Sequence, residues 1–113
     1  MAVDNNLKLK LITYNMHGFF QGQPTIHDLI LSENPDVIFV QEHWLNPANL
    51  GKFDTHFSDF FSFRISAMSN VVDCGMLRGR PFGGVLTLIN NRLRAICESV
   101  YCSERYVIIR VAN

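Results

Sequence analysis

The stretch that most constrains the fold is "DVIFV" at residues 36–40, where four apolar residues follow one aspartate without interruption. A strand with one solvated face alternates apolar and polar residues, whereas a strand buried on both faces does not. The run "VLTLIN" at residues 85–90 is a second apolar segment of strand length. Both runs therefore predict strands whose two faces each need a covering layer.

The segments on either side of residues 36–40 predict an α/β fold. "LKLKLITYN" is expected to form a strand that ends near Asn15, followed by a loop marked by glycine and proline. Thr25 is expected to cap a short helix with Asp28 in its first turn, and the residue before Pro35 should end that helix. Strand, helix and strand at this spacing predict a right-handed β-α-β unit with a parallel strand pair.

The rest of the chain predicts further strands and a closing hairpin. We expect one or two helical turns at 46–53, strands at 60–68 and 85–90, a long loop at 69–84, and a hairpin turn near Ser103 and Glu104. Counted as one sheet, the six strands have helices on one face only, so the other face lacks a partner. The sequence also stops within "YVIIRVAN". We therefore expect residues 1–113 to be the N-terminal portion of a larger domain.

Composition indicates a globular chain, and the N-terminal segment favours an intracellular location. A hydrophobic content of 48% with 18% charged residues is unlike a disordered segment, and ten basic residues balance ten acidic ones. The chain lacks the excess of positive charge that would indicate nucleic-acid binding. A neutral protein can still bind phosphates locally. The N-terminus does not resemble a signal peptide, and no apolar run approaches the roughly 20 residues that cross a bilayer. We expect no membrane association, and a nuclear or cytoplasmic location.

The three cysteines fit no C-x-x-C pattern and are odd in number. Reduced thiols are the expected state, since disulfides are rare in cytosolic and nuclear proteins. The alternative is that Cys97 and Cys102 face each other across the closing hairpin.

Asn15 and Glu42 are the main candidates for chemistry. Each follows or ends one of two strands expected to be parallel neighbours, and ligands of open α/β sheets gather outside the carboxyl ends of such strands. A carboxylate there suits Mg²⁺ or Mn²⁺, and an asparagine can orient the carboxylate or a phosphate oxygen. The alternative is that Asn15 is a turn residue and Glu42 a solvated strand end, because polar residues often finish strands.

Other polar residues offer weaker signals. His17 and His43 lie close to the expected edge, but no H-x-x-x-H or Cys/His spacing supports a zinc site. The sequence contains no G-x-S-x-G motif, which would indicate a nucleophilic serine. In "RGRPFGG", Arg78 and Arg80 can be interpreted as phosphate contacts beside a base-stacking phenylalanine, or as part of an exposed loop whose glycines serve turn geometry.

Three motifs in order, "LKLITYNMHG", "PDVIFVQEHWL" and "GGVLTLINNRL", resemble the endonuclease/exonuclease/phosphatase superfamily of metal-dependent phosphodiesterases. "QEHWL" with "GRPFGGV" is most similar to the endonuclease domains of non-LTR (LINE-type) retrotransposons. The resemblance implies a DNase I-like, two-sheet α/β sandwich with a mixed sheet and flanking helices. It also implies Mg²⁺ or Mn²⁺ as cofactor and DNA as partner.

The resemblance assigns the metal-binding glutamate to Glu42 and the active-site asparagine to Asn15. His17, which we add as a substrate-binding candidate, stands where some members carry an acidic residue, which puts a second metal position in question. The family's later catalytic motifs would lie beyond Asn113, so we expect an incomplete domain that is inactive alone. Its further partner would be the missing C-terminal half or another protein chain. The alternatives are a non-catalytic truncated product and an α/β interaction module.

Overall fold

The computed structural model describes residues 8–65, 83–102 and 106–112. A four-stranded sheet has the order β1-β2-β4-β3, and β5 and β6 form a separate two-stranded sheet. The helices and strands run in the order β1 (Leu11–Asn15), α1 (Phe19–Glu33), β2 (Val37–Gln41), η1 (Pro47–Asn49), α2 (Lys52–His56), β3 (Phe60–Ile65), β4 (Val85–Asn90), η2 (Asn91–Ile96), β5 (Cys97–Cys102) and β6 (Val107–Val111). The predicted mixed α/β class is confirmed.

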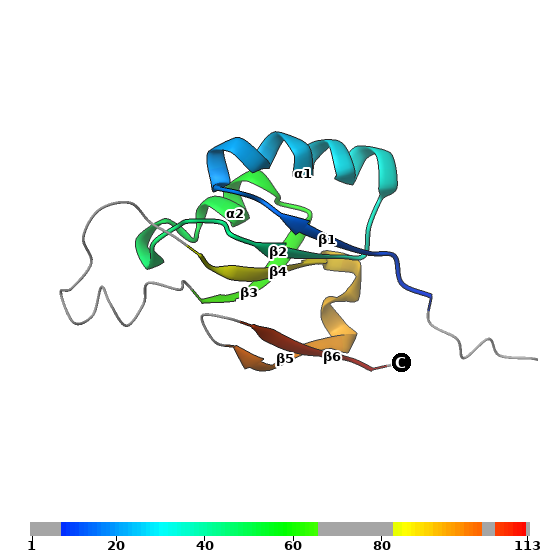
Figure 1. Cartoon of the computed structure of the whole chain (residues 1–113). Coiled ribbons are helices and arrows are strands. Elements are labelled where there is room, and N and C mark those ends of the chain that lie inside the picture. Colours follow the sequence, from blue (N-terminus) through cyan, green and yellow to red (C-terminus); the bar gives the residue numbers. More distant parts are fainter. Residues whose placement is uncertain (1–7, 66–82, 103–105, 113) are drawn as a thin grey trace, which may run out of the picture.

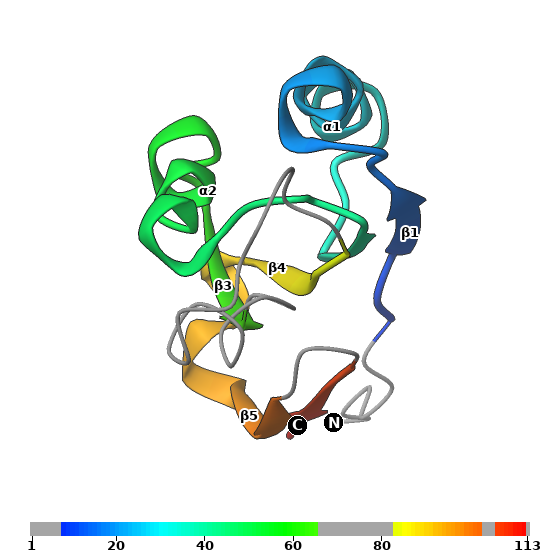
Figure 2. The ribbon, with the colours of Figure 1, turned by 60° about the vertical axis from the view of Figure 1, so that its left-hand side comes forward.

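The four-stranded sheet is the middle layer of three. Helices α1 and α2 lie on one face, and the β5–β6 hairpin lies on the other (Figures 1 and 2). Along β2, Ile38 and Val40 belong to the core under the helices, whereas Val37 and Phe39 belong to the core under the hairpin. The uninterrupted apolar run is therefore buried on both faces, as predicted. The expected single six-stranded sheet is wrong, because the hairpin folds back to cover the open face.

Strands β1 and β2 are parallel and α1 connects them, as the spacing predicts. In contrast, β4 pairs antiparallel with both β2 and β3, which makes the sheet mixed. The register pairs Leu11 with Val37 at one end and Asn15 with Gln41 at the other. Both strands thus have their carboxyl ends at the same edge of the sheet.

Helix α1 begins six residues earlier than its predicted cap at Thr25. Gly18 is its N-cap, and Pro24 lies within the helix although a proline there lacks the amide donor. A Cβ on Gly22 would overlap the Met16 side chain and come within 2.6 Å of the Met16 carbonyl oxygen. Gly22 therefore allows the helix to approach the end of β1, and does not mark a loop.

The first turn of α1 carries no acidic residue, so the expected position of Asp28 beside the helix N-terminus is also wrong. The predicted end of the helix is confirmed, since α1 stops at Glu33 and Asn34 adopts a left-handed conformation with φ 46°.

Asp36 joins three strands at the edge opposite the carboxyl ends of β1 and β2. Its side chain accepts a 2.7 Å hydrogen bond from the Lys10 backbone amide and an ion-paired hydrogen bond from Arg92. Its own amide donates to the Lys10 carbonyl at 2.9 Å, and its carbonyl accepts from the Asn90 amide at 2.8 Å. The carboxylate is largely buried, with 13% of the side chain exposed.

We predict that Asp36→Ala lowers the free energy of unfolding by about 2 kcal/mol, because the Lys10 amide loses a charged acceptor in a part-buried site. Urea denaturation at pH 7 measures this change. The matched control is Glu98→Ala, which removes a more exposed ion pair with Arg110 (3.0 Å) and should cost no more than about 1 kcal/mol. Equal losses in the two variants would contradict a structural role for Asp36.

The register of the β5–β6 hairpin tests the alternative that two cysteines face each other across it. Cys97 and Cys102 both lie in β5 and pair with Val111 and Val107, so they do not face each other across the hairpin, and that alternative is wrong. Cys97 is a free, half-buried thiol, and burial raises its pKa.

Among the described residues, no helix is long and apolar enough to cross a membrane. The compartment stays a prediction.

Candidate functional site

The backbone brings Asn15 and Glu42 to one edge of the sheet. Asn15 pairs in register with Gln41, and Glu42 is the next residue along the chain. Past the last pair, the Met16 amide donates to the Gln41 carbonyl and the Gly18 amide donates to the Glu42 carbonyl, both at 2.8 Å. The two segments therefore stay together beyond the ends of the strands. This is the arrangement expected from the sequence, although the chemical roles of the two side chains stay predictions.

The segment after β2 has an unusual backbone. Glu42 and Trp44 have φ angles of 57° and 59°, in the left-handed region that costs most residues of order 1–3 kcal/mol. The Glu42 amide donates to the Gly84 carbonyl at 2.8 Å, and the Trp44 amide donates to the Gly83 carbonyl at 2.9 Å. These bonds, made to a segment some 40 residues later, hold the strained conformation in place.

The Glu42 carboxylate has a specific partner. The indole Nε1 of Trp44 donates to Glu42 Oε2 at 2.7 Å. The indole also lies against His17, with ring centroids 4.8 Å apart. The His17 backbone amide donates to Asn15 Oδ1 at 3.1 Å. His17, an exposed substrate-binding candidate, thus links the ends of the two strands through Trp44 and Asn15.

His43 is completely buried between the two strained residues. Its Nδ1 accepts a 3.0 Å hydrogen bond from the Leu45 amide, which assigns the proton of the neutral ring to Nε2. Nε2 is buried without a hydrogen-bond partner among the described residues. Burial lowers the pKa of His43 to about 4, and the negative charge of Glu42 partly opposes this shift.

The roles of His43 and Trp44 in the site were not predicted from the sequence. The signal that could have found them is the alternation in "EHWL", in which Glu42 and Trp44 occupy one set of alternate positions while His43 and Leu45 occupy the other. Both His43 and Leu45 are buried, and both Glu42 and Trp44 are partly exposed. Arg78 and Arg80 lie outside the described residues.

Comparison with known protein families shows which family the chain belongs to. The sequence model of the "Endonuclease/Exonuclease/phosphatase family" matches residues 12–112, nearly the whole chain. The chain belongs to this endonuclease/exonuclease/phosphatase family. No curated protein sequence matches it significantly.

A solved structure with the same fold is the 3′ phosphatase NExo from Neisseria, determined with a product DNA hairpin. The TM-score is 0.52 and the identity 15%, over 73% of this chain and 27% of NExo. At this identity the likeness establishes the fold. This member of the endonuclease/exonuclease/phosphatase family thus spans about a quarter of the length of that neighbour.

A divalent metal fits the edge of this family member only as a minimal site. Among the described residues, no group of three or more histidine, cysteine, aspartate or glutamate side chains could hold a metal ion. Mg²⁺, however, is often held by one or two carboxylates together with waters and substrate phosphates. The partly exposed Glu42 carboxylate, with the Asn15 amide on the next strand, matches that pattern.

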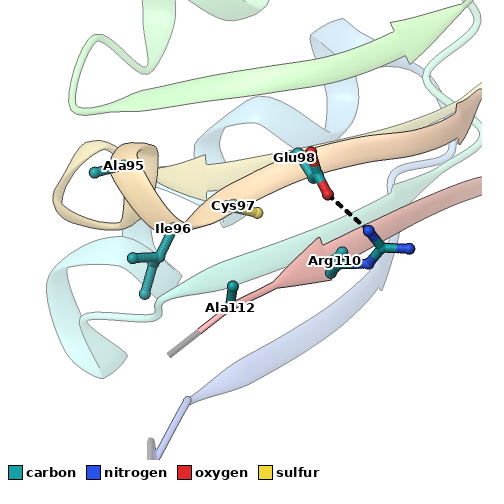
Figure 3. Close-up of a pocket in the computed structure, with 6 residues that line it drawn as sticks. All are labelled: Ala95, Ile96, Cys97, Glu98, Arg110 and Ala112. Carbon is teal, nitrogen blue, oxygen red and sulfur yellow. Dashed lines mark hydrogen bonds and ion pairs between the residues drawn. The ribbon is translucent and has the colours of Figure 1, made fainter.

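A pocket of about 200 Å³ lies elsewhere, at the C-terminal hairpin. Its lining residues are Ala95, Ile96, Cys97, Glu98, Arg110 and Ala112, and the Glu98–Arg110 ion pair crosses between its two strands (Figure 3). None of the candidate residues lines it. We therefore assign the candidate site to the strand edge and not to this pocket.

Proposed function

We propose that this chain provides the metal-binding edge of a divalent-metal-dependent phosphodiesterase that acts on DNA. The observation that carries the proposal is Glu42, a carboxylate held in a strained backbone conformation beside Asn15 at the carboxyl ends of two parallel strands. Strained residues persist where the surrounding structure fixes them, and they cluster at functional sites. Family membership supports the reaction class, and the DNA hairpin bound to NExo supports the substrate class.

The proposed roles follow from side-chain chemistry. Glu42 binds Mg²⁺ or Mn²⁺, and Asn15 orients the substrate phosphate or the carboxylate. A metal bound there would neutralise charge on the scissile phosphate and activate a water molecule. His17 is proposed to contact substrate from the exposed side of the edge, and Arg78 and Arg80 are proposed phosphate contacts on the basis of the sequence.

The finer assignment follows the motifs "QEHWL" and "GRPFGGV", which resemble LINE-type retrotransposon endonucleases. We propose that the chain belongs to that branch and nicks DNA together with further catalytic residues. These would come from the remainder of the domain or from another protein chain, because Glu42 is a single carboxylate and a single ligand does not complete the mechanism.

Metal binding can be read directly, because Trp44 is the only tryptophan in the chain and its indole contacts Glu42. We predict that Mn²⁺ produces a saturable change in tryptophan fluorescence. In Glu42→Gln the apparent affinity should fall at least about 10-fold, since even residues that only support a metal ligand contribute 10–100-fold. Glu98→Gln, which changes an exposed carboxylate in the hairpin, is the matched control and should titrate like the original chain.

Unchanged Mn²⁺ affinity in Glu42→Gln would refute the metal-ligand role. A plasmid-nicking assay with Mg²⁺ then separates the remaining alternatives. The 113-residue chain should not nick DNA, and neither should Glu42→Ala. Nicking that depends on Glu42 would support the catalytic role and contradict the expected inactivity of the isolated chain. Absence of both nicking and Mn²⁺ binding would favour an interaction module.

A further inference from the structure

The hydrogen bond between Trp44 and Glu42 is chemically selective. An indole Nε1–H is a donor only, so it can bond to the charged carboxylate but cannot itself bind a metal ion. At 2.7 Å from Oε2 it is a short, charge-assisted bond in a part-buried position. No described residue donates a hydrogen bond to the other carboxylate oxygen. The bond therefore distinguishes two oxygens that would otherwise be equivalent.

Trp44 is held by three contacts, two to its indole ring and one to its backbone. His17 lies against its ring, and a Cβ on Gly18 would come within 2.8 Å of Trp44 Cε3, so the indole packs directly over the glycine. From the opposite segment, the Gly83 carbonyl accepts the Trp44 backbone amide. Trp44 therefore contacts the segments that follow β1 and precede β4, and its indole nitrogen fixes the Glu42 carboxylate relative to both.

Backbone conformation makes this contact possible. Glu42 and Trp44 both adopt left-handed φ angles, and the residue between them, His43, is buried. The two side chains thus leave the segment on its partly exposed side, two residues apart, and meet through the indole nitrogen. The hydrogen bond thus joins two residues that both have strained backbone conformations, and such residues cluster at functional sites.

We propose that Trp44 is the positioning residue of this site: its Nε1–H holds Glu42 Oε2 and leaves the second oxygen directed to a divalent cation. The proposal rests on the metal-binding role of Glu42 given above. Partners that hydrogen-bond to a metal ligand typically contribute 10–100-fold to metal affinity, because they orient the ligand and fix its charge. Removing the Nε1–H while keeping the ring should therefore weaken Mn²⁺ binding about 10-fold or more.

Because Trp44 is the only tryptophan, an analogue incorporated in place of tryptophan changes this site alone. β-(3-Benzothienyl)alanine replaces the Nε1–H by sulfur and keeps the bicyclic shape, whereas 4-fluorotryptophan keeps the N–H and is the matched control. Mn²⁺ affinity, measured from the electron paramagnetic resonance of free Mn²⁺, should fall about 10-fold for the first analogue and stay unchanged for the second. Trp44→Phe provides a genetically encoded second test. The melting temperature of each variant separates loss of positioning from loss of the fold.

The failures of the two proposals are distinguishable. If the unsubstituted chain binds no Mn²⁺, both the proposed metal site and the role of Trp44 are overturned. If Mn²⁺ binds and requires Glu42, but binds equally well without the Nε1–H, only the role of Trp44 is overturned. Weakened binding in both benzothienylalanine and Trp44→Phe proteins, with unchanged binding in the fluorotryptophan protein, supports it.

Discussion

Replacing Gly84 by alanine will destabilise the fold by about 2–6 kcal/mol, combining backbone strain of about 1–3 kcal/mol with overpacking of about 1–3 kcal/mol. Gly84 has a φ of 95°, in the left-handed region that favours glycine. A Cβ there would overlap the His43 imidazole and approach Nδ1 to 2.8 Å. That ring is completely buried and packs edge-on against Phe53, so it has little room to move.

Urea denaturation of Gly84→Ala measures the effect, and Gly51→Ala is its matched control. Gly51 has a φ of −62°, and a Cβ there would meet nothing within 4 Å. That substitution should be neutral or stabilise by up to about 1 kcal/mol, through reduced freedom of the unfolded chain. Similar stability changes in the two variants would contradict the packing assigned to Gly84.

A double substitution divides the effect of Gly84→Ala into its two causes. In a His43→Ala background the overlap with the imidazole is gone, so Gly84→Ala should cost about 1–3 kcal/mol less, while the strain from φ 95° remains. Additive effects would mean that His43 does not confine Gly84. The Gly84 carbonyl accepts a hydrogen bond from the Glu42 amide. Gly84→Ala should therefore also weaken the binding of Mn²⁺ by the folded protein.

The part of the fold that local pattern determines could be predicted from the sequence. The uninterrupted run 37–40 required cover on both faces, and the spacing between residues 15 and 36 required a parallel pair, which together place Asn15 and Glu42 at one edge. These inferences depend on side-chain alternation and chain connectivity. Both are properties of short segments that tertiary packing did not override.

The errors occurred where a residue's local preference yielded to a tertiary contact. Glycine and proline at positions 22 and 24 predicted a loop, yet both lie within α1, and Gly22 is required for the approach to Met16. The hairpin was expected to extend the sheet, but its half-buried Ile109 packs instead on the core of Val37 and Ile89. Neither contact has a local signature in the sequence.

The detailed geometry of the candidate site was unpredictable for a related reason. The left-handed conformations of Glu42 and Trp44 are held by the carbonyls of Gly84 and Gly83, which follow some 40 residues later. The motif "QEHWL" identifies the glutamate, but its hydrogen bond from Trp44 depends on that long-range pairing. The burial of His43 depends on it as well, because its ring lies against Gly84.

Acid will destabilise this fold through His43, by as much as roughly 3 kcal/mol between pH 6.5 and pH 4. The folded protein binds a proton on His43 only near pH 4, whereas the unfolded chain binds it near 6.5. Lowering the pH through this window therefore protonates the unfolded chain first and favours unfolding. The stability contributed by the neutral, buried imidazole is fully present above pH 6.5 and is lost as the pH falls towards 4.

Urea denaturation at several pH values, compared with His43→Asn, isolates this contribution. Asparagine can keep an acceptor for the Leu45 amide but does not titrate, and subtracting the two profiles removes the effects of other ionisable groups. The free energy of unfolding of the original chain, minus that of His43→Asn, should fall by roughly 3 kcal/mol between pH 7 and pH 4. A difference that does not change with pH would refute the burial effect on His43.

Glu42 provides a test of what shifts the pKa of His43. Its negative charge raises the pKa of His43 and so opposes the larger effect of burial. Glu42→Gln removes that charge while keeping the size of the side chain, so the pKa of His43 in the folded protein should fall further. The loss of stability on acidification should then continue to a lower pH and become larger than in the original chain. An unchanged profile would mean that the Glu42 charge has no influence on His43, although the two residues are adjacent.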